Sequence, residues 1–395
     1  MRLRTPGRRR PSVLFAGQSY YHAWYLSREL RRLGWRADVL NWNYDAAAQD
    51  FFHGEDFSFT WDSRRGRRHL PHLAFYLRSV PRYDIFHFSN AQGIRFGHPL
   101  HEWFARKFHP YAEIELLRRL GKKIVYSNNG CLDGVAQSSF AAWGDRPVCL
   151  DCPWRERPDV CSDERNLQWG HDRNRLAHFQ CNFGGNRKDY NDDPTVHEVP
   201  EFYCLDPEFW RPDLEVPQRW QLDLPSSTVK IYHAVGNFQK RTAGGRNIKS
   251  THIYLPLIDR MKAEGYDVEL TFVHGVPNKD VRFTQVQADI VVDMLTFGWF
   301  GSNVREAMML GKPVVCYLRP EWLESMRQEV PDYVDELPVV SATPETVEDV
   351  LKELLRDPER RRELGERGRA FALKYHSAQA GARRMDTIYR ELLGA

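Results

Sequence analysis

The chain of 395 residues is 42% hydrophobic, enough to bury more than one core, so we expect two domains rather than a disordered protein. Its 56 Lys and Arg residues against 53 Asp and Glu residues give a formal net charge of +3, too small a surplus to indicate nucleic-acid binding. No apolar run reaches the roughly 20 residues that a membrane-spanning helix requires.

The N-terminus carries a cluster of arginines, namely Arg2, Arg4, Arg8, Arg9 and Arg10. Such a cluster could contact anionic lipid or another polyanion, or it could be a solvated tail. No signal-peptide core follows it. We therefore expect a cytoplasmic protein, with peripheral contact to the inner membrane face as an open alternative.

Apolar strands alternate with amphipathic helices in the N-terminal half, as is typical of a doubly wound α/β domain. A predicted strand at Ser12–Ala16 is followed by a turn at Gly17 and a helix over Tyr21–Leu33, which ends at Gly34. Gly17 would allow the backbone to approach a ligand closely at this first turn. The pattern continues with strands at Ala37–Leu40, Tyr83–Phe88 and Lys123–Tyr126, and a helix at Ala112–Leu120.

Polar side chains follow two of these strands. Ser89, Asn90 and Gln92 come after one strand, and the run Ser127–Gly130 comes after the other. Open parallel sheets bind ligands at the carboxyl ends of their strands, so we expect both clusters to face a ligand. His87 lies within its strand, where a buried structural role and a catalytic role are both open.

Four of the seven cysteines fall within one segment with few secondary-structure signals, at Cys131, Cys149, Cys152 and Cys161. The C-x-x-C pair can place two thiolates on one ion, and the other two cysteines could complete a tetrahedral structural zinc site. Reduced thiols and a redox disulfide are the alternatives. Substitute ligands are His171, His178 and Cys181. We expect a zinc-stapled insertion at about residues 131–181.

A proline-rich stretch, Val199–Pro212, separates the two halves of the chain. Beyond it, strands are predicted at Val229–Val235, Val268–Val273, Asp289–Val292 and Pro313–Tyr317, with helices between them. Charged amphipathic helices follow at Val347–Leu355, Glu359–Lys374 and Ala378–Leu393. We expect an N-terminal domain at 1–205, a second Rossmann-like domain at 206–376 and a C-terminal helix at 377–395.

A basic, glycine-bearing loop follows the first strand of the second half. It spans Gly236–Ser250 and carries Lys240, Arg241, Arg246 and Lys249. Cations at this edge of a parallel sheet would suit a diphosphate, because they neutralise charge that builds on the leaving phosphate. A solvated basic loop is the alternative.

A glycine-rich turn, Gly298–Asn303, leads into a predicted helix that carries Glu306. The unpaired backbone N–H groups of such a turn favour an anion, and the carboxylate could accept hydrogen bonds from hydroxyls. Ser302 and Asn303 are further candidates for ligand contact. The alternative is an amphipathic helix of the kind that lies between two strands in any doubly wound domain.

This segment resembles the retaining glycosyltransferases of the GT-B fold, in the group often called family 4. The family pattern is Glu, seven residues, Glu-Ala-Met and then Gly-x-Pro-Val-Val. The second half is present as Glu306-Ala-Met and Gly311-x-Pro-Val-Val, whereas the position of the first Glu is occupied by Gly298. The resemblance implies two Rossmann-like α/β domains that face each other across a cleft, with the last helix packing back on the N-terminal domain.

The resemblance also implies roles for individual residues. Glu306 would hold the ribose of a nucleotide sugar, and Arg246 and Lys249 would bind its diphosphate. The resemblance implies that donor binding requires no catalytic metal. We nominate no catalytic residue, because in this family the leaving phosphate itself accepts the incoming proton, and the enzyme supplies positioning and electrostatics.

We therefore expect a retaining, hexosyltransferase-like enzyme that moves a sugar from a nucleoside diphosphate to an acceptor hydroxyl, in the synthesis of cell-surface glycans, glycolipids or glycoconjugates. The acceptor could be a glycan, a lipid-linked sugar or a small molecule. Two alternatives stay open, a nucleotide-sugar-binding protein without activity and a nucleotide-sugar epimerase on the same fold. A nucleic-acid-binding zinc protein is a weaker alternative, because the net charge is close to neutral.

Overall fold

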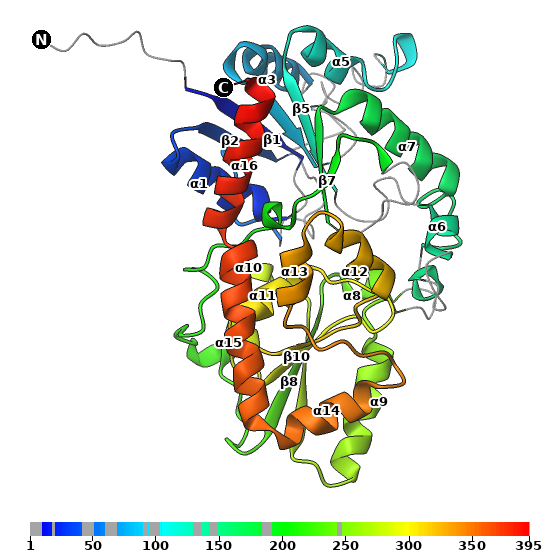
Figure 1. The fold of residues 1–395 in the computed structure, drawn as a ribbon, viewed down its shortest axis with the longest axis vertical. Helices are drawn as coiled ribbons and strands as arrows, with labels where there is room; N and C mark the ends of the chain where they lie inside the picture. The colour runs from blue at the N-terminus through cyan, green and yellow to red at the C-terminus, as the bar shows by residue number, and fades with distance from the viewer. Residues whose placement is uncertain are drawn as a thin grey trace, which may run out of the picture.

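Two parallel β-sheets organise the chain into two α/β units, one above the other in Figure 1. The computed structural model describes residues 10–17, 20–41, 51–59, 69–89, 94, 103, 105–128, 136–141, 148–152, 154–183, 192–242 and 247–394. Each unit alternates strands with helices, so the predicted α/β class with two Rossmann-like sheets is confirmed.

The first sheet has seven parallel strands in the order β3-β2-β1-β4-β5-β6-β7. The strands are β1 (Ser12–Ala16), β2 (Arg36–Asn41), β3 (Phe57–Ser58), β4 (Ile85–Phe88), β5 (Lys123–Ser127), β6 (Phe179–Asn182) and β7 (Val196–Glu198). Its helices are α1 (His22–Arg32), α3 (His69–Arg82), α5 (Ala112–Arg119), α6 (Gln137–Ala141) and α7 (Asp163–Leu176). The strand order reverses between β1 and β4, which is where sheets of this kind bind ligands.

The segment predicted to be an irregular insertion, residues 131–181, is more regular than expected. Its described part contains α6, a short 3₁₀ helix at Val148–Asp151, α7 and most of β6, and β6 pairs with β5 inside the sheet. Helix α7 was missed because its apolar residues are sparse. It is secured at its start by Ser162, whose hydroxyl accepts from the Arg165 amide, and by Asp163 and Glu164 in the first turn.

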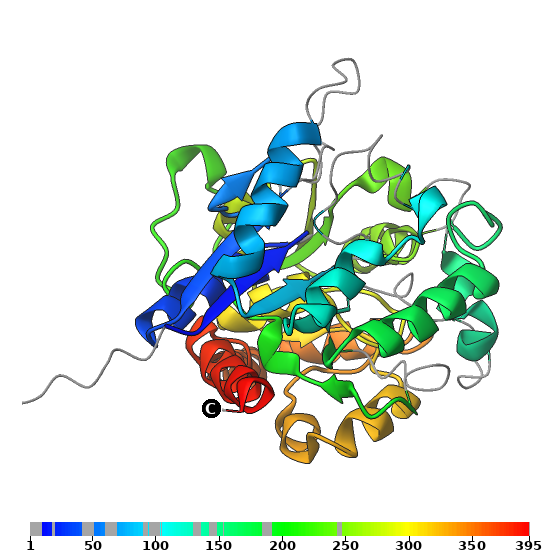
Figure 2. The ribbon, with the colours of Figure 1, turned by 90° about the horizontal axis from the view of Figure 1, so that it is seen from above.

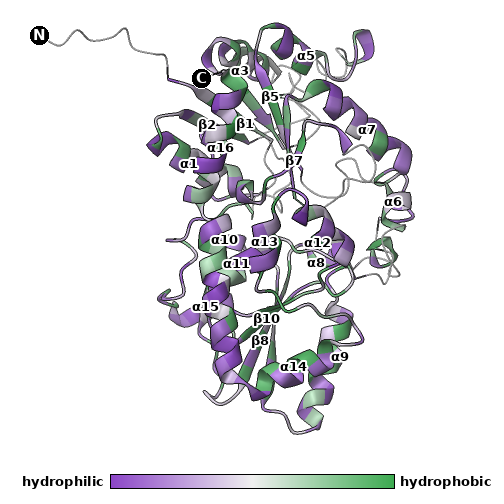
Figure 3. Ribbon diagram, viewed as in Figure 1, coloured by the Kyte–Doolittle hydropathy of each residue, from purple (hydrophilic) through white to green (hydrophobic). Residues whose placement is uncertain are grey.

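The second sheet has four parallel strands in the order β11-β10-β8-β9. The strands are β8 (Val229–Val235), β9 (Val268–His274), β10 (Ile290–Val292) and β11 (Val314–Val315). The helices are α8 (Phe238–Arg241), α9 (Thr251–Ala263), α10 (Asn278–Gln285), α11 (Ser302–Met309), α12 (Pro320–Arg327), α13 (Pro331–Glu336), α14 (Val347–Arg356) and α15 (Pro358–Tyr375). Figure 3 shows hydrophobic colour along β8 and β10 and hydrophilic colour on the outer face of α15.

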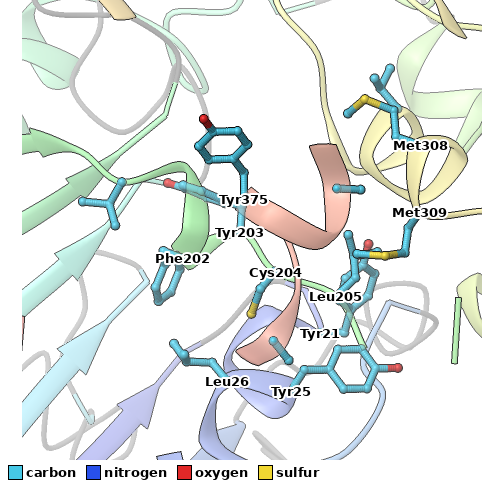
Figure 4. Packing of buried hydrophobic residues seen from close by; sticks show 14 of the residues in the cluster. Tyr21, Tyr25, Leu26, Phe202, Tyr203, Cys204, Leu205, Met308, Met309 and Tyr375 are labelled. Carbon is cyan, nitrogen blue, oxygen red and sulfur yellow. The ribbon is translucent and has the colours of Figure 1, made fainter. Parts of the chain in front are cut away.

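The two sheets are joined by a continuous hydrophobic cluster. Figure 4 shows part of it, with Tyr25 and Leu26 from α1, Met308 and Met309 from α11, and Leu205 from the connecting segment. That connection includes 3₁₀ helices at Pro200–Phe202 and Gln218–Trp220. Because apolar side chains of both units share one cluster, separating them would expose core surface to water.

The last helix, α16 (Ala378–Leu393), leaves the second unit and packs along α1 of the first (Figures 1 and 2). Trp35 Nε1 donates to Asp386 Oδ1 at 2.5 Å, and the Tyr389 hydroxyl lies 2.6 Å from His87 Nδ1. His87 is therefore a buried structural residue, and burial lowers its pKa to about 3. The predicted return of the C-terminal helix is confirmed.

None of the helices in the described part of the chain combines the length and the apolar character that crossing a bilayer demands.

Candidate functional site

A cavity of about 660 Å³ lies between the two sheets. One wall is formed by residues that follow strands of the first sheet, including Ser89 after β4, Asn128 after β5 and Phe183 after β6. The opposite wall includes Gly275 after β9 and Met294 after β10. Both sheets thus turn their carboxyl ends toward one space, as the polar residues after the predicted strands indicated.

Glu306 is an acidic residue that lines this cavity. It lies on α11, is 3% exposed, and its Oε1 accepts the Tyr21 hydroxyl at 2.6 Å and Asn278 Nδ2 at 3.0 Å. Its Oε2 receives no hydrogen bond from the described residues, although the side chain lines the cavity. One carboxylate oxygen is therefore held by protein, and the other is left to accept hydroxyl groups of a ligand.

The partners of Glu306 are themselves fixed by a chain of neutral groups. Asn278 Oδ1 accepts from His53 Nε2 at 2.8 Å, and His53 Nδ1 in turn is bonded to the Tyr25 hydroxyl. Burial lowers the pKa of His53 to about 3, so the ring is neutral at physiological pH. Since Tyr25 and His53 belong to the first unit and Asn278 to the second, both units position the Glu306 carboxylate.

Burial raises the pKa of Glu306 above its ordinary value, although hydrogen bonds from Tyr21 and Asn278 oppose this shift. Burial also raises the pKa of Tyr21 well above the usual range, and the neighbouring carboxylate adds to this effect. The phenol consequently stays protonated and continues to donate. The carboxylate accepts hydroxyls best when it is ionised, so ligand binding should weaken as the pH falls through its raised folded-state pKa.

Lys249 lies in the same cavity and is paired with a buried aspartate. Its Nζ lies 2.8 Å from Asp293 Oδ1, and the two side chains are 9% and 0% exposed. Asp293 follows β10, so the pair fixes the ammonium at the carboxyl end of the second sheet. An ammonium has three protons, which leaves donors for a phosphate in the cavity.

The turn before α11 also reaches the cavity. Gly301 precedes the helix without a side chain to cap it, and Ser302 and Asn303 open the first turn. The Asn303 side chain is partly committed, because Gln285 Nε2 donates to its Oδ1 at 3.1 Å. The unpaired N–H groups at this helix start are the feature that suits an anion.

The other two predicted donor-binding residues, Gly17 and Arg246, are not among the described residues that line the cavity. Gly17 follows β1 and has a positive φ of 73°. Arg246 lies outside the described residues. Arg241, in the same basic loop, does line the cavity. Among the predicted donor-binding residues, Lys249, Ser302, Asn303 and Glu306 are thus brought together.

The expected structural zinc is not supported. Within the described part of the chain, no three His, Cys, Asp or Glu side chains are arranged to hold a metal ion. Cys149, Cys152 and Cys161 instead line the cavity, and the Cys161 thiol accepts from Gln137 Nε2 at 3.4 Å. Burial raises the pKa of Cys149 to about 12, so this thiol is protonated. Cys131 lies outside the described residues.

The alternative zinc ligands form no metal site with the cysteines that the structure describes. Cys181 is fully buried within β6, and His178 Nδ1 accepts the backbone amide of Ile124 at 3.0 Å. His171 lies on α7. The cysteine-rich segment therefore contributes a wall of the cavity rather than a recognisable metal centre within the described residues.

Gly298, the position of the family's first acid, has a physical reason to be glycine. Its φ is +100°, and a Cβ there would lie 2.6 Å from Arg319 Cβ and 2.7 Å from Arg319 Nε. Arg319 is 1% exposed, and its backbone amide donates to the Gly298 carbonyl at 2.7 Å. The space next to this position is therefore filled by an arginine side chain.

His22 is a cavity residue that the sequence analysis did not predict. His22 lies at the start of α1, its Nδ1 is 2.9 Å from the Cys204 carbonyl, and Nε2 has no partner in the described part of the chain. Burial, followed by the nearby Arg305 charge, lowers the pKa of His22 to about 3. A neutral imidazole with a free acceptor nitrogen thus faces the cavity. No periodicity signalled it, because it lies in the first turn of an ordinary amphipathic helix.

Comparison with known proteins supports this description. Residues 254–371 match the sequence profile of the family described as glycosyl transferases group 1. No curated protein matches the chain in sequence. The α11 segment, with Glu306, falls inside the matched range.

Solved structures share the whole fold at low sequence identity. Sucrose-phosphate synthase from Thermosynechococcus elongatus is 15% identical with a TM-score of 0.57, covering 98% of this chain and 100% of its own. HepE from Anabaena, in complex with UDP-glucose, is 13% identical with a TM-score of 0.57, covering 96% of this chain and 99% of its own. A glycosyltransferase from Rickettsia africae is 11% identical with a TM-score of 0.54, covering 98% of this chain and 99% of its own. The chain has the GT-B fold of these glycosyltransferases.

Proposed function

We propose that this protein is a glycosyltransferase that moves a sugar from a nucleoside diphosphate donor to an acceptor hydroxyl, with retention at the anomeric carbon. The observation that carries the proposal is Glu306, a buried carboxylate on α11, with Oε1 held by Tyr21 and Asn278 and Oε2 left for a ligand. A sugar or ribose presents the paired hydroxyls that such an oxygen accepts.

The neighbouring charges fit the diphosphate of the donor. Lys249, Arg241 and the uncapped start of α11 all border the cavity that Glu306 lines. As the glycosidic bond breaks, negative charge grows on the leaving phosphate, and fixed cations and backbone amides stabilise it without reorganisation. The match to glycosyl transferases group 1 covers α11, and HepE, a protein of the same fold, has been seen with UDP-glucose.

Retention is supported by the resemblance of the Glu306 segment to family 4 enzymes. In such a mechanism the leaving phosphate takes the proton of the acceptor, and the protein supplies positioning and an electrostatic field. His22 would favour the opposite stereochemical course, since its neutral ring faces the cavity. A base on the far side of the sugar would give inversion, so the configuration of the product decides between the two.

The proposal is tested by titrating purified protein with UDP-, GDP-, ADP- and dTDP-sugars, followed by turnover with glycan, lipid-linked and small-molecule acceptors. Binding of one donor and transfer or slow hydrolysis are expected. Glu306→Ala should weaken donor binding by roughly tenfold to a hundredfold, because a hydrogen bond to a charged group contributes about 1.5–3 kcal/mol. Glu363→Ala, an exposed acid on α15, is the matched control.

The outcomes separate the candidate functions. Transfer with an unchanged anomeric configuration, measured by proton NMR coupling constants, supports the retaining enzyme. Tight donor binding without turnover would identify a nucleotide-sugar-binding protein. A change of sugar configuration without acceptor would identify an epimerase. Failure of every nucleotide sugar to bind would overturn the proposal.

A further inference from the structure

Arg305 is a buried cation that forms no ion pair within the described part of the chain, although its charge acts on the neighbouring Glu306 carboxylate. It lies on α11, is 4% exposed, and forms one hydrogen bond within the described part of the chain, from Nη2 to Ser302 Oγ at 3.2 Å. Its Nε is buried and unbonded, and no carboxylate of the described residues lies within ion-pair distance. Arginine is rarely buried to this extent unless it is paired.

Aromatic rings make up part of what surrounds the guanidinium. Its central carbon lies 5.2 Å from the centre of the Phe183 ring and 5.5 Å from that of Tyr203. Rings of this kind attract a cation through their electron-rich faces, but they do not replace hydrogen-bond acceptors. The side chain borders the cavity, so an anion from solution can supply the missing acceptors there.

The side chains of Arg305 and Glu306 contact different neighbours at the cavity. Consecutive residues on a helix do not face the same direction. Glu306 contacts Tyr21 and Asn278, whereas Arg305 approaches Phe183 after β6 and Tyr203 after the 3₁₀ helix at Pro200–Phe202, both in the first unit. An anion bound by Arg305 would thus lie beside Phe183 and Tyr203, which are not among the hydrogen-bond partners of Glu306.

The charges suited to the donor diphosphate come from a different segment. Lys249 and Arg241 belong to the loop region between β8 and α9. Lys249 is already oriented by Asp293, whereas Arg305 has no such partner among the described residues. His22, which shares the cavity wall near Arg305, is neutral and does not oppose an anion by charge, but neither does it neutralise the guanidinium.

We propose that Arg305, together with the Ser302 hydroxyl, forms an anion-binding subsite for a phosphate or carboxylate group carried by the acceptor. Assigning the anion to the acceptor rests on the proposed function, whereas the anion subsite itself does not. The planar guanidinium has paired N–H groups that match two oxygens of such an anion.

The first test uses the ligand-free protein. Arg305→Met keeps the apolar stem and removes a charge that forms no ion pair with the described residues, so the melting temperature should stay unchanged or rise. An arginine that held the fold together by ion pairs would instead lower it when removed. A clear fall in melting temperature for Arg305→Met would overturn the view that this charge awaits a ligand.

The second test uses inorganic phosphate as the probe, by calorimetry in the presence of a saturating nucleotide. Wild type should bind phosphate, and Arg305→Met should bind it at least about tenfold more weakly, with nucleotide affinity changed by less than about threefold. Arg305→Lys, which keeps the charge but not the paired geometry, should lie between them. Arg383→Gln, an exposed arginine on α16, should match wild type.

Two results of this test would overturn the proposal. One is the absence of phosphate binding by wild type once nucleotide is bound. The other is a loss of nucleotide affinity in Arg305→Met, which would assign Arg305 to the donor diphosphate. If no nucleotide binds at all, the proposed function fails, but phosphate binding that depends on Arg305 is still measurable without nucleotide.

The source of the anion is identified with acceptor pairs. A sugar phosphate is compared with the same sugar without phosphate, a hexuronate with its hexose, and a polyprenyl phosphate in detergent with the polyprenol. The charged member of one pair should be preferred at least about tenfold by wild type and not by Arg305→Met. Equal use of charged and neutral members in every pair would overturn the assignment to the acceptor.

Discussion

The two walls of the cavity are built from different chemistry. The wall of the second sheet carries charged side chains, and two of them are held by specific partners, Lys249 by Asp293 and Glu306 by Asn278 and Tyr21. The wall of the first sheet is mainly aromatic, thiol and neutral polar. Under the proposed function, a donor diphosphate needs fixed charge, so the charged wall of the second sheet is the one that suits the donor.

The largest effect expected from breaking the charged wall is on stability. Lys249→Met leaves Asp293 buried without a counter-charge, which should lower the free energy of unfolding by about 3–5 kcal/mol. Urea denaturation measures this change. The double variant Lys249→Met with Asp293→Asn should recover most of the loss while donor binding stays weak. If Lys249→Met has the same free energy of unfolding as wild type, the Lys249–Asp293 ion pair does not stabilise this wall.

The second prediction concerns the helix that ties the first wall to the second unit. A Cβ at Gly381 of α16 would lie 2.6 Å from the Glu201 carbonyl oxygen and 3.1 Å from Cys204 Sγ. The backbone at Glu201 cannot move away without an energetic cost, so Gly381→Ala should lower the free energy of unfolding by about 1–3 kcal/mol through overpacking. Thr387→Ala, exposed on the same helix, should change stability by less than about 0.5 kcal/mol. Equal melting temperatures for both variants would contradict tight packing at Gly381.

A third prediction separates binding from folding at Glu306. Its folded-state pKa is raised by burial, so the carboxyl favours the folded state below the unfolded-state pKa and loses this advantage as the pH rises through the folded-state value. Glu306→Gln should therefore raise the melting temperature at neutral pH and not at acid pH, while donor affinity falls. Melting curves across pH test this prediction. A variant that is less stable at neutral pH would show that the ionised carboxylate supports the fold.

The smallest effect is expected at the contact that joins the walls. Tyr21→Phe removes one hydrogen bond to Glu306 Oε1, worth about 1 kcal/mol, and should weaken donor binding about fivefold without abolishing turnover. Tyr266→Phe is the control, because its hydroxyl bonds only a surface arginine, Arg356. Donor titration by fluorescence distinguishes the two. Unchanged affinity in Tyr21→Phe would mean that Asn278 alone orients the carboxylate.

Much of the second wall could be predicted from local sequence. A glycine-rich turn, the helix bearing Glu306 and the apolar strand at Val314–Val315 are contiguous, so periodicity and turn chemistry were enough to place them. Lys249 could be assigned to the loop after β8 for the same reason. Its partner Asp293 could not, because 44 residues separate the two and no local pattern links them.

The first wall was harder to predict because its contacts are long-range. Tyr21 meets Glu306 across 285 positions, and within the sequence Tyr21 is an apolar residue at a helix start. The cysteines suggested a metal by spacing, yet the described thiols are distributed along a cavity wall. Arg305 offered one signal, since a charged residue directly beside Glu306 on a helix with buried neighbours needs an explanation.

The carboxylate of Glu306 is shared by two bodies, because Oε1 accepts from Tyr21 in the first unit and from Asn278 in the second. If the two units move apart by even the length of one hydrogen bond, the carboxylate loses one of its two hydrogen bonds, the one from Tyr21 or the one from Asn278, and becomes free to rotate. If the proposed function holds, donor affinity would therefore depend on the angle between the two units.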